Sequence, residues 1–264
     1  MPKADSRLTV IKIGGSLLEK GGFNSLIPHI ARFLKRNRAV IVHGGGREIT
    51  AWAKRLGIKS RFVGGRRYTD DKLMGIVEMV LCGDVNPTFV RALNSSEVNA
   101  MGFSGRDGML IQAKPVTGLG RVGIPITEKI KTGLIRMFLA KGIVPVFASV
   151  ASGSNGKALN INADEMAASL AVALKARRLI LFTDVPGILD KSKRTIRHIS
   201  PETGRDLIRN GTVFGGMIPK VKSAFTALKK GVKEIWILEG KLPLSRARGT
   251  LISQNAAGAS HPFS

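Results

Sequence analysis

Two lysines in this 264-residue chain stand where a cation is costly unless an anion lies beside it. Lys12 lies near the end of the apolar run Leu8–Ile13, and only Ile13 separates it from Gly14-Gly15. Burying an ammonium group at such a place costs free energy unless an anion meets it. Lys220 follows another glycine pair, in the first turn of an expected helix, where the helix dipole disfavours cations. These positions make sense if an anion meets Lys12 and a phosphate shares the site of Lys220, and a surface lysine is the alternative for each.

Glycine motifs follow two apolar runs, at Gly14-Gly15 and at Gly44-Gly45-Gly46. Ligands of a parallel sheet collect beyond the carboxyl ends of its strands, where glycines leave backbone N–H groups uncovered. The second motif also opens into an expected helix, whose N-terminus attracts anions. The two loops therefore predict a phosphate site, and tight turns without a ligand are the alternative. Neither loop matches the Walker pattern or a clean Gly-x-Gly-x-x-Gly motif.

Polar residues introduce two further segments. Asn162 is suited to cap the helix that follows it, and Asp164 is favourable near that helix N-terminus. The functional interpretation is a carboxylate at Asp164 that orients the two lysines. Thr183–Gly187 follows an apolar run with turn chemistry, as a simple turn or as a nucleotide-recognition loop. His43 precedes the glycine triplet, and we interpret it as a strand-end residue without a catalytic role.

The elements that must position these residues alternate between two periodicities. Apolar runs alternate with amphipathic segments, which predicts an α/β fold with a parallel or mostly parallel sheet covered on both faces. The stretch 110–131 is rich in Gly, Pro, Thr and Val, and we expect β-hairpins there, at one edge. Strands are expected over 8–13, 39–43, 143–147, 179–182 and 234–238, and helices around 26–34, 49–56, 69–81, 163–175 and 217–230.

The composition is that of an ordinary globular protein with an unusual charge. Lys and Arg number 42 against 18 Asp and Glu, a net charge of +24. Such a surface is soluble, attracts anionic substrates such as nucleotides, or binds nucleic acid or an acidic protein. The basic clusters are scattered, and no aromatic stacking motif accompanies them, which disfavours a specific nucleic-acid site.

Cysteine content and apolar runs set the expected compartment. One cysteine, Cys82, cannot form an internal disulfide or a Cys-rich metal site, so we expect a cytoplasmic protein. Charged residues and glycines interrupt the apolar runs before about 18 residues, so we expect no membrane-spanning helix. The N-terminus carries no signal-peptide pattern.

Seven motifs occur together in an order that resembles the amino-acid kinase family. Each motif is weak alone, but the ordered set between residue 8 and about residue 238 is specific. Within the family, the set resembles the members that phosphorylate N-acetyl-L-glutamate. The motifs are Lys12-Ile13-Gly14-Gly15, Val42-His43-Gly44-Gly45-Gly46, Phe62-Val63-Gly64-Gly65-Arg66-Arg67-Tyr68-Thr69-Asp70, Gly102-Phe103-Ser104-Gly105-Arg106-Asp107-Gly108, Asn160–Asp164, Thr183–Gly187 and Gly215–Lys220.

The resemblance implies a three-layer αβα sandwich with a mainly parallel central sheet. One kinase domain would span residues 1–264, with an acyl-amino-acid lobe over about 1–175 and a nucleotide lobe over about 176–264. The implied reaction moves the γ-phosphoryl group of ATP onto the γ-carboxylate of N-acetyl-L-glutamate, a step of arginine biosynthesis. Mg²⁺ would be held mainly through phosphate oxygens, so no protein ligand is assigned to it.

The resemblance also assigns roles to residues. Lys12 and Lys220 would stabilise the transferring phosphoryl group, and Asp164 would position both lysines. The substrate-binding residues would be Gly44, Gly45, Gly65, Arg67 and Asn160, and the nucleotide-binding residues would be Gly14, Gly15, Asp184, Gly187, Gly215 and Met217.

Three departures from the family pattern bear on assembly and specificity. The segment before Leu8 is short and lacks the extra helix of arginine-inhibited hexameric members, so we expect a homodimer without that inhibition. The stretch Glu239–Ile252 also looks shortened. Arg66 stands where relatives carry an apolar residue, and we expect it to influence substrate choice.

Two other functions remain open from the sequence. A related kinase phosphorylates α-aminoadipate or glutamate carried on a small acidic protein, and a cationic surface would suit that partner. A basic nucleic-acid-binding protein is the alternative of another class.

Overall fold

The structure is a computed structural model that describes residues 8–17, 25–240, 249–254 and 261–263. The expected short N-terminal segment and much of the stretch Glu239–Ile252 therefore lie outside the described residues. An eight-stranded sheet forms the centre, in the order β12-β14-β13-β11-β1-β2-β8-β5. Its strands are β1 (Leu8–Ile13), β2 (Arg38–His43), β5 (Ala100–Ser104), β8 (Val144–Ala148), β11 (Arg178–Thr183), β12 (His198–Ile199), β13 (Glu234–Glu239) and β14 (Gly249–Ile252).

The sheet is mainly parallel, as the sequence predicts. Every neighbouring pair from β13 to β5 is parallel, and β14 runs antiparallel to β13. The chain passes from β1 to β2 on one side, and β11 later pairs with β1 on the other. The carboxyl ends of these three strands therefore surround the point where the strand order reverses, which is where open α/β sheets bind ligands.

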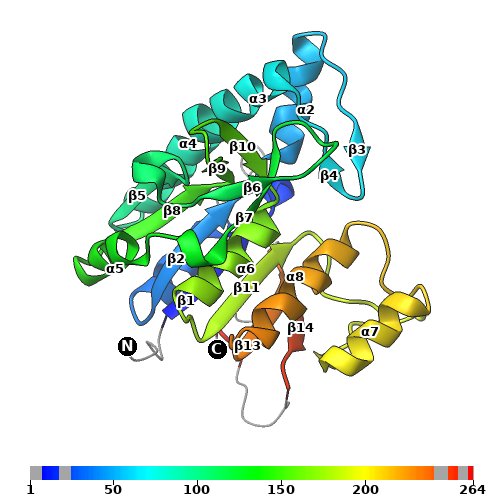
Figure 1. Ribbon diagram of the computed structural model, residues 1–264. Helices are drawn as coiled ribbons and strands as arrows, with labels where there is room; N and C mark the ends of the chain where they lie inside the picture. The colour runs from blue at the N-terminus through cyan, green and yellow to red at the C-terminus, as the bar shows by residue number, and fades with distance from the viewer. Residues whose placement is uncertain (1–7, 18–24, 241–248, 255–260, 264) are drawn as a thin grey trace.

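Helices cover both faces and complete three layers (Figure 1). Alternation along β1 sends Ile11 and Ile13 into one apolar cluster and Leu8 and Val10 into another. The first cluster includes residues of α1 (Ile27–Leu34), α2 (Gly46–Arg55), α3 (Asp71–Glu78) and α4 (Asn86–Asn94). The second includes residues of α5 (Thr132–Ala140), α6 (Ala163–Ala173) and α8 (Met217–Lys229), and α7 (Pro201–Arg209) packs against α8. The predicted αβα sandwich is thus confirmed.

The residues predicted to form hairpins build a second sheet. β6 (Ala113–Pro115) and β7 (Val122–Pro125) pair antiparallel, and β10 (Ala158–Ile161) and β9 (Val150–Ser152) complete the order β6-β7-β10-β9. The hairpin is confirmed, but it belongs to this separate sheet and does not extend the edge of the central one. A two-stranded hairpin of β3 (Phe62–Val63) and β4 (Arg66–Arg67) stands beside it.

One continuous helical segment runs further than the sequence predicts. Asp70 caps α3 by accepting a 2.8 Å hydrogen bond from the Leu73 backbone, and a π-helical stretch, Met79–Val85, then joins α3 to α4. The 24 residues Asp71–Asn94 are long enough to cross a membrane, and an 18-residue window within them has a mean hydropathy of 1.4. Half of the apolar window is buried within the fold, so this segment packs as a core helix.

Candidate active site

Three charged side chains from distant parts of the sequence meet at the carboxyl end of β1. Lys12 points from β1 toward α6, Asp164 is the second residue of α6, and Lys220 lies in the first turn of α8. The Lys12 Nζ atom is 2.9 Å from Asp164 Oδ1, and the Lys220 Nζ atom is 2.9 Å from Asp164 Oδ2. The two ammonium groups thus share one carboxylate and one site.

Burial and mutual charge set the protonation of this triad. The Lys12 side chain is 6% exposed, and burial lowers its pKa from 10.5 to about 8, with repulsion from Lys220 adding to the effect and Asp164 opposing it. Burial raises the pKa of Asp164, but the two lysines outweigh it and bring the value to about 2. The same carboxylate outweighs burial at Lys220 and raises its pKa. At neutral pH the triad therefore carries two positive charges and one negative charge.

Two glycine loops come into direct contact beside the triad. A Cβ placed on Gly15 would lie 3.0 Å from the Gly46 backbone nitrogen and 3.2 Å from Gly45 Cα. A Cβ on Gly45 would lie 2.5 Å from a Leu81 methyl carbon, so a side chain there would need the core to shift. The predicted loops therefore form one closely packed backbone surface next to Lys12.

The predicted substrate-binding residues line one cavity of about 200 Å³. Gly44, Gly45, Gly65, Arg67 and Asn160 all border it, and Lys12, Gly15 and Asp164 close the same space. The cavity therefore has a cationic end at the triad and a second cation at Arg67. The structure thus brings these predicted residues together around one cavity.

Arg67 is buried and well anchored. Its guanidinium donates to Ser60 Oγ at 2.5 Å, the Gly46 carbonyl at 2.6 Å and Thr50 Oγ1 at 2.8 Å. Burial lowers its pKa, but guanidinium groups stay protonated in proteins. Asn160 donates from Nδ2 to Thr69 Oγ1 at 3.1 Å. Arg67 is therefore a fixed cation at the wall of the cavity.

The predicted nucleotide-binding residues divide into two groups. Gly14 directly follows β1, and Gly15 lines the cavity described above. Asp184 follows β11 and is close enough to Lys220 to help raise the pKa of that lysine. Gly187 lies in the loop after β11, Gly215 lies just before α8, and Met217 is the first residue of α8. None of Asp184, Gly187, Gly215 and Met217 is among the described residues that line the 200 Å³ cavity.

Comparison with known proteins identifies the family. The model of the amino acid kinase family matches residues 7–239. The chain belongs to this family. An acetylglutamate kinase of Endomicrobium trichonymphae is 42% identical over 94% of this chain and 100% of that protein. An acetylglutamate kinase of Rhodopseudomonas palustris is 41% identical over 92% of this chain and 86% of that protein. A crystal structure of a Streptococcus mutans protein superposes with a TM-score of 0.86 at 28% identity, covering 95% of this chain and all of that one.

Some residues that support this amino acid kinase site escape sequence reasoning. His43 is fully buried and lies against Asn86. Asn86 Nδ2 donates to His43 Nε2 at 2.9 Å, and His43 Nδ1 donates to the Gly44 carbonyl at 2.9 Å. Burial lowers the pKa of His43 to about 4, so the ring is neutral. Both ring nitrogens are engaged, which agrees with the interpretation of His43 as a non-catalytic residue. Asn86 carried no signal, because its partner is 43 residues away.

Proposed function

We propose that this chain is an acetylglutamate kinase, which transfers the γ-phosphoryl group of ATP to the γ-carboxylate of N-acetyl-L-glutamate. The observation that carries the proposal is the meeting of Lys12, Asp164 and Lys220 beside two bare glycine loops, at one end of a cavity that also holds Arg67. Relatives named acetylglutamate kinase match almost the whole chain at about 40% identity. The family assignment makes the protein a phosphotransferase with ATP as its phosphoryl donor.

Positioning and charge are the main requirements of the proposed reaction. An oxygen of the acceptor carboxylate forms a bond to the γ-phosphorus of ATP, the bond from that phosphorus to the bridging oxygen breaks, and ADP leaves with the electron pair. A carboxylate needs no base, so no proton has to move. The obstacle is repulsion between anions, and each close charge pair supplies about 4 kcal/mol before desolvation at a surface-like dielectric. Only the part that grows in the transition state accelerates the step.

We assign Lys12 and Lys220 to the transferring phosphoryl group and Asp164 to holding the two lysines together. Both carboxylate oxygens of Asp164 already contact lysines, so this residue is not free to bind a metal ion. Mg²⁺ would therefore reach the site through the phosphates of ATP, whose charge it would neutralise. Gly14 and Gly15 would supply backbone donors along the phosphoryl path, whereas the Gly44 N–H already donates to the Ile13 carbonyl at 3.3 Å.

Substrate and nucleotide occupy opposite sides of the triad in this proposal. Arg67 and Asn160 hold the α-carboxylate and amide groups of the acceptor, with Gly45 and Gly65 giving close backbone approach. Asp184, Gly187, Gly215 and Met217 border the nucleotide. The acceptor lobe would then extend over about residues 1–175 and the nucleotide lobe over about 176–264. A biosynthetic enzyme of this kind would work in the cytoplasm.

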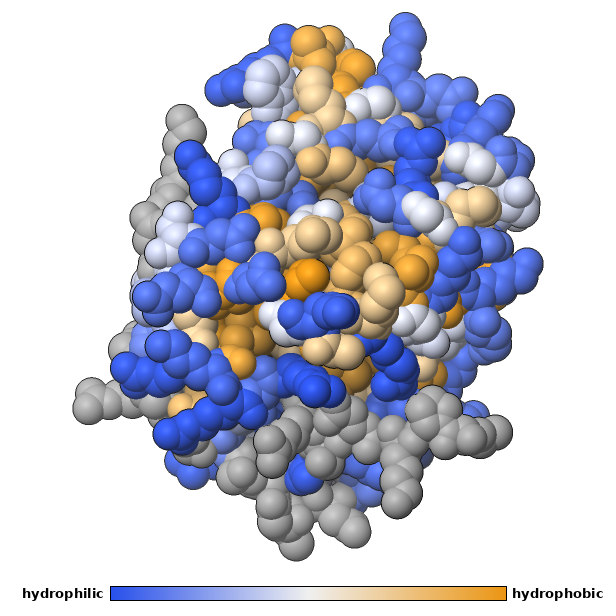
Figure 2. Space-filling view, turned by 90° about the vertical axis from the view of Figure 1, so that its left-hand side faces the viewer, coloured by the Kyte–Doolittle hydropathy of each residue, from blue (hydrophilic) through white to orange (hydrophobic). Residues whose placement is uncertain are grey.

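We also propose a homodimer, supported by an apolar face. β5 is the edge strand of the central sheet, and Figure 2 shows apolar side chains gathered on the side that carries β5 and α5. Met101 on β5 is 44% exposed, and Leu134 and Met137 on α5 are 41% and 49% exposed. Exposed apolar patches of this kind mark association surfaces. Met101→Lys should shift the mass measured by light scattering toward the monomer.

The names of the relatives favour free N-acetylglutamate over the other functions. Neither an acidic carrier protein nor a nucleic acid is needed to explain the site. The net charge of +24 keeps a test of the carrier worthwhile, because it would attract such a partner.

An ATP-consumption assay with a panel of acceptors tests the proposal. The panel compares N-acetyl-L-glutamate, N-succinyl-L-glutamate, glutamate, aspartate and a carrier-linked glutamate. We expect N-acetyl-L-glutamate to give the highest kcat/KM. Turnover of the carrier-linked acceptor without turnover of the free acetylated one would refute the assignment.

A further inference from the structure

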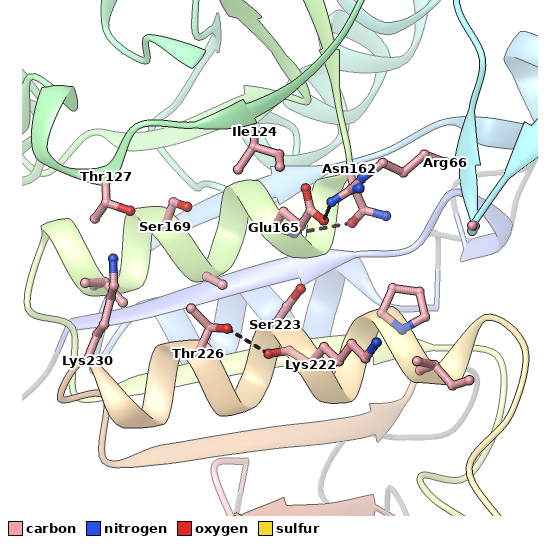
Figure 3. Close-up of a pocket in the computed structure, with 16 residues that line it drawn as sticks. Arg66, Ile124, Thr127, Asn162, Glu165, Ser169, Lys222, Ser223, Thr226 and Lys230 are labelled. Atoms are coloured by element: carbon pink, nitrogen blue, oxygen red, sulfur yellow. Dashed lines mark hydrogen bonds and ion pairs between the residues drawn. The ribbon is translucent and has the colours of Figure 1, made fainter. Parts of the chain in front are cut away.

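A second cavity lies next to the acceptor cavity and has no role in the proposed reaction. Its volume is about 390 Å³, and it runs between α6 and α8 (Figure 3). Its surface is mixed: hydroxyl groups of Thr127, Ser169 and Thr226 line it together with the apolar side chains of Ile124 and Val172. The space is thus large enough for a short aliphatic chain with a polar end.

The two cavities share a wall. Gly65, Arg66 and Asn162 border both of them. Figure 3 shows Arg66, Asn162 and Glu165 together at one end of the larger cavity, with Lys230 at the other. Gly65 has no side chain. Asn162 is occupied as the cap of α6, because its side chain accepts hydrogen bonds from the backbone N–H groups of Asp164 and Glu165. Arg66 is therefore the long side chain that fills the wall.

An ion pair holds Arg66 in place. Its Nη2 atom lies 2.5 Å from Glu165 Oε1, joining the β3–β4 hairpin to the first turn of α6 across 99 residues of sequence. Both side chains are mostly buried, at 29% and 19% exposed. The helix dipole favours a carboxylate at the position of Glu165. The ion pair thus directs the Arg66 side chain toward α6.

The alternation of side chains along a strand explains why the neighbouring residues Arg66 and Arg67 contact different helices. Arg66 and Arg67 are successive residues of β4, so their side chains point to opposite sides of the hairpin. Arg67 reaches Gly46 and Thr50 of α2, while Arg66 reaches Glu165 of α6. Glu165 neutralises the additional cation and keeps it away from the carboxylate-binding side.

The acceptor has three arms, and its geometry directs one of them to this wall. The inference rests on the proposed function. With the γ-carboxylate toward Lys12 and the α-carboxylate toward Arg67, the N-acyl group faces the remaining part of the cavity, which includes Val122 and Arg66. Arg66 separates that part from the 390 Å³ space, so an acyl chain that extends toward this wall would meet it.

We propose that the Arg66–Glu165 ion pair sets the length of the N-acyl group that this enzyme accepts. The pair closes the acceptor cavity at the size of a short acyl group and separates it from the 390 Å³ space. Shortening Arg66 joins the two cavities and lets longer acyl chains enter the second one.

The test uses neutral acceptors of increasing chain length: N-acetyl-, N-butanoyl- and N-hexanoyl-L-glutamate. For the wild-type enzyme, kcat/KM should fall at least about tenfold from acetyl to hexanoyl, because a filled pocket excludes extra methylenes. In Arg66→Ala this ratio should shrink by about tenfold or more, since the hexanoyl chain gains a cavity. Glu165→Gln keeps the size of the side chain, releases Arg66 and should give an intermediate ratio.

Arg177→Ala is the matched control, because it removes an arginine–glutamate contact with Glu234 at the amino ends of β11 and β13. Its chain-length ratio should equal that of the wild type. For any variant with low turnover, calorimetric binding of the three acceptors without ATP gives the corresponding ratio of dissociation constants. Equal wild-type rates with all three acceptors, or an unchanged ratio in Arg66→Ala and Glu165→Gln, would overturn the inference. Failure of the wild type to use N-acetyl-L-glutamate would instead overturn the proposed function.

Discussion

Replacing Lys220 with alanine should affect the rate of catalysis much more than the stability of the fold. The Lys220 Nζ atom donates to Asp164 Oδ2 at 2.9 Å, and its side chain is 18% exposed. In the variant, Asp164 keeps its contact with Lys12 through Oδ1, so no buried carboxylate is left without a cation. The change therefore removes the charge that we propose binds the phosphoryl group, while leaving the rest of the triad paired.

The two effects differ in size. A hydrogen bond to a charged group contributes about 1.5–3 kcal/mol to stability, and release of a partly buried ammonium group offsets some of that. We expect the free energy of unfolding to fall by about 1–2 kcal/mol. Loss of one preorganised donor to the reacting group costs roughly 10²- to 10³-fold in kcat. Turnover should therefore fall far more than the fold weakens.

Steady-state kinetics and denaturant unfolding measure the two effects on the same preparation. Lys229→Ala is the control, since Lys229 is an exposed residue at the other end of α8 and should leave kcat unchanged. Lys220→Ala should also raise the pKa of Lys12, because it removes the repulsion that lowers it, and so move the alkaline limb of kcat/KM upward. A pure, folded Lys220→Ala enzyme with wild-type turnover would refute the role given to this lysine.

Three further predictions follow from the site and its loops. Arg67→Ala should raise the KM for N-acetyl-L-glutamate roughly 10- to 100-fold with a smaller effect on kcat, because a buried charged donor is lost; an unchanged KM would remove Arg67 from the acceptor site. For the wild type, kcat/KM should fall as pH rises past about 8, since the pKa of Lys12 lies there and only its protonated form attracts phosphate; a rate that stays flat to pH 10 would contradict this. Gly187→Ala should lower the free energy of unfolding by about 1–3 kcal/mol more than Gly231→Ala does. Both glycines have positive φ, at 98° and 104°, but only at Gly187 would a Cβ come within 2.8 Å of Thr250 Oγ1; equal losses in chemical denaturation would dismiss the steric argument.

The parts of the fold that the sequence predicts well are those in which burial is complete. Expected strands at 8–13, 39–43 and 179–182 agree with β1, β2 and β11 within one residue, because each is a continuous apolar run buried on both faces. The helix expected to end near Leu81 instead continues to Asn94. Gly83 and Pro87 are typical breakers, but a π-helical turn accommodates the first, and the second occupies the start of α4, where proline fits.

The candidate site also contains some features that the sequence signals and others that it does not. Lys12, Asp164 and Lys220 carry unusual residue types for their local positions, so the sequence marks each of them. Their meeting at one point depends on the fold and was predicted through the family resemblance. The pairing of Arg66 with Glu165 had no local signal, because 99 residues separate the partners and each side chain would be ordinary on a protein surface. The volume of a cavity likewise depends on how side chains pack in the fold, so the sequence does not predict it.

The sealed imidazole of His43 has a consequence for how the enzyme responds to acid. Its Nε2 atom accepts from Asn86, which it can do only while unprotonated. With a pKa near 4, this nitrogen stays unprotonated throughout the range of pH found inside cells. The loop that begins at Gly44 therefore keeps its anchor during ordinary acidification, and the glycine surface beside Lys12 holds its shape while other groups titrate.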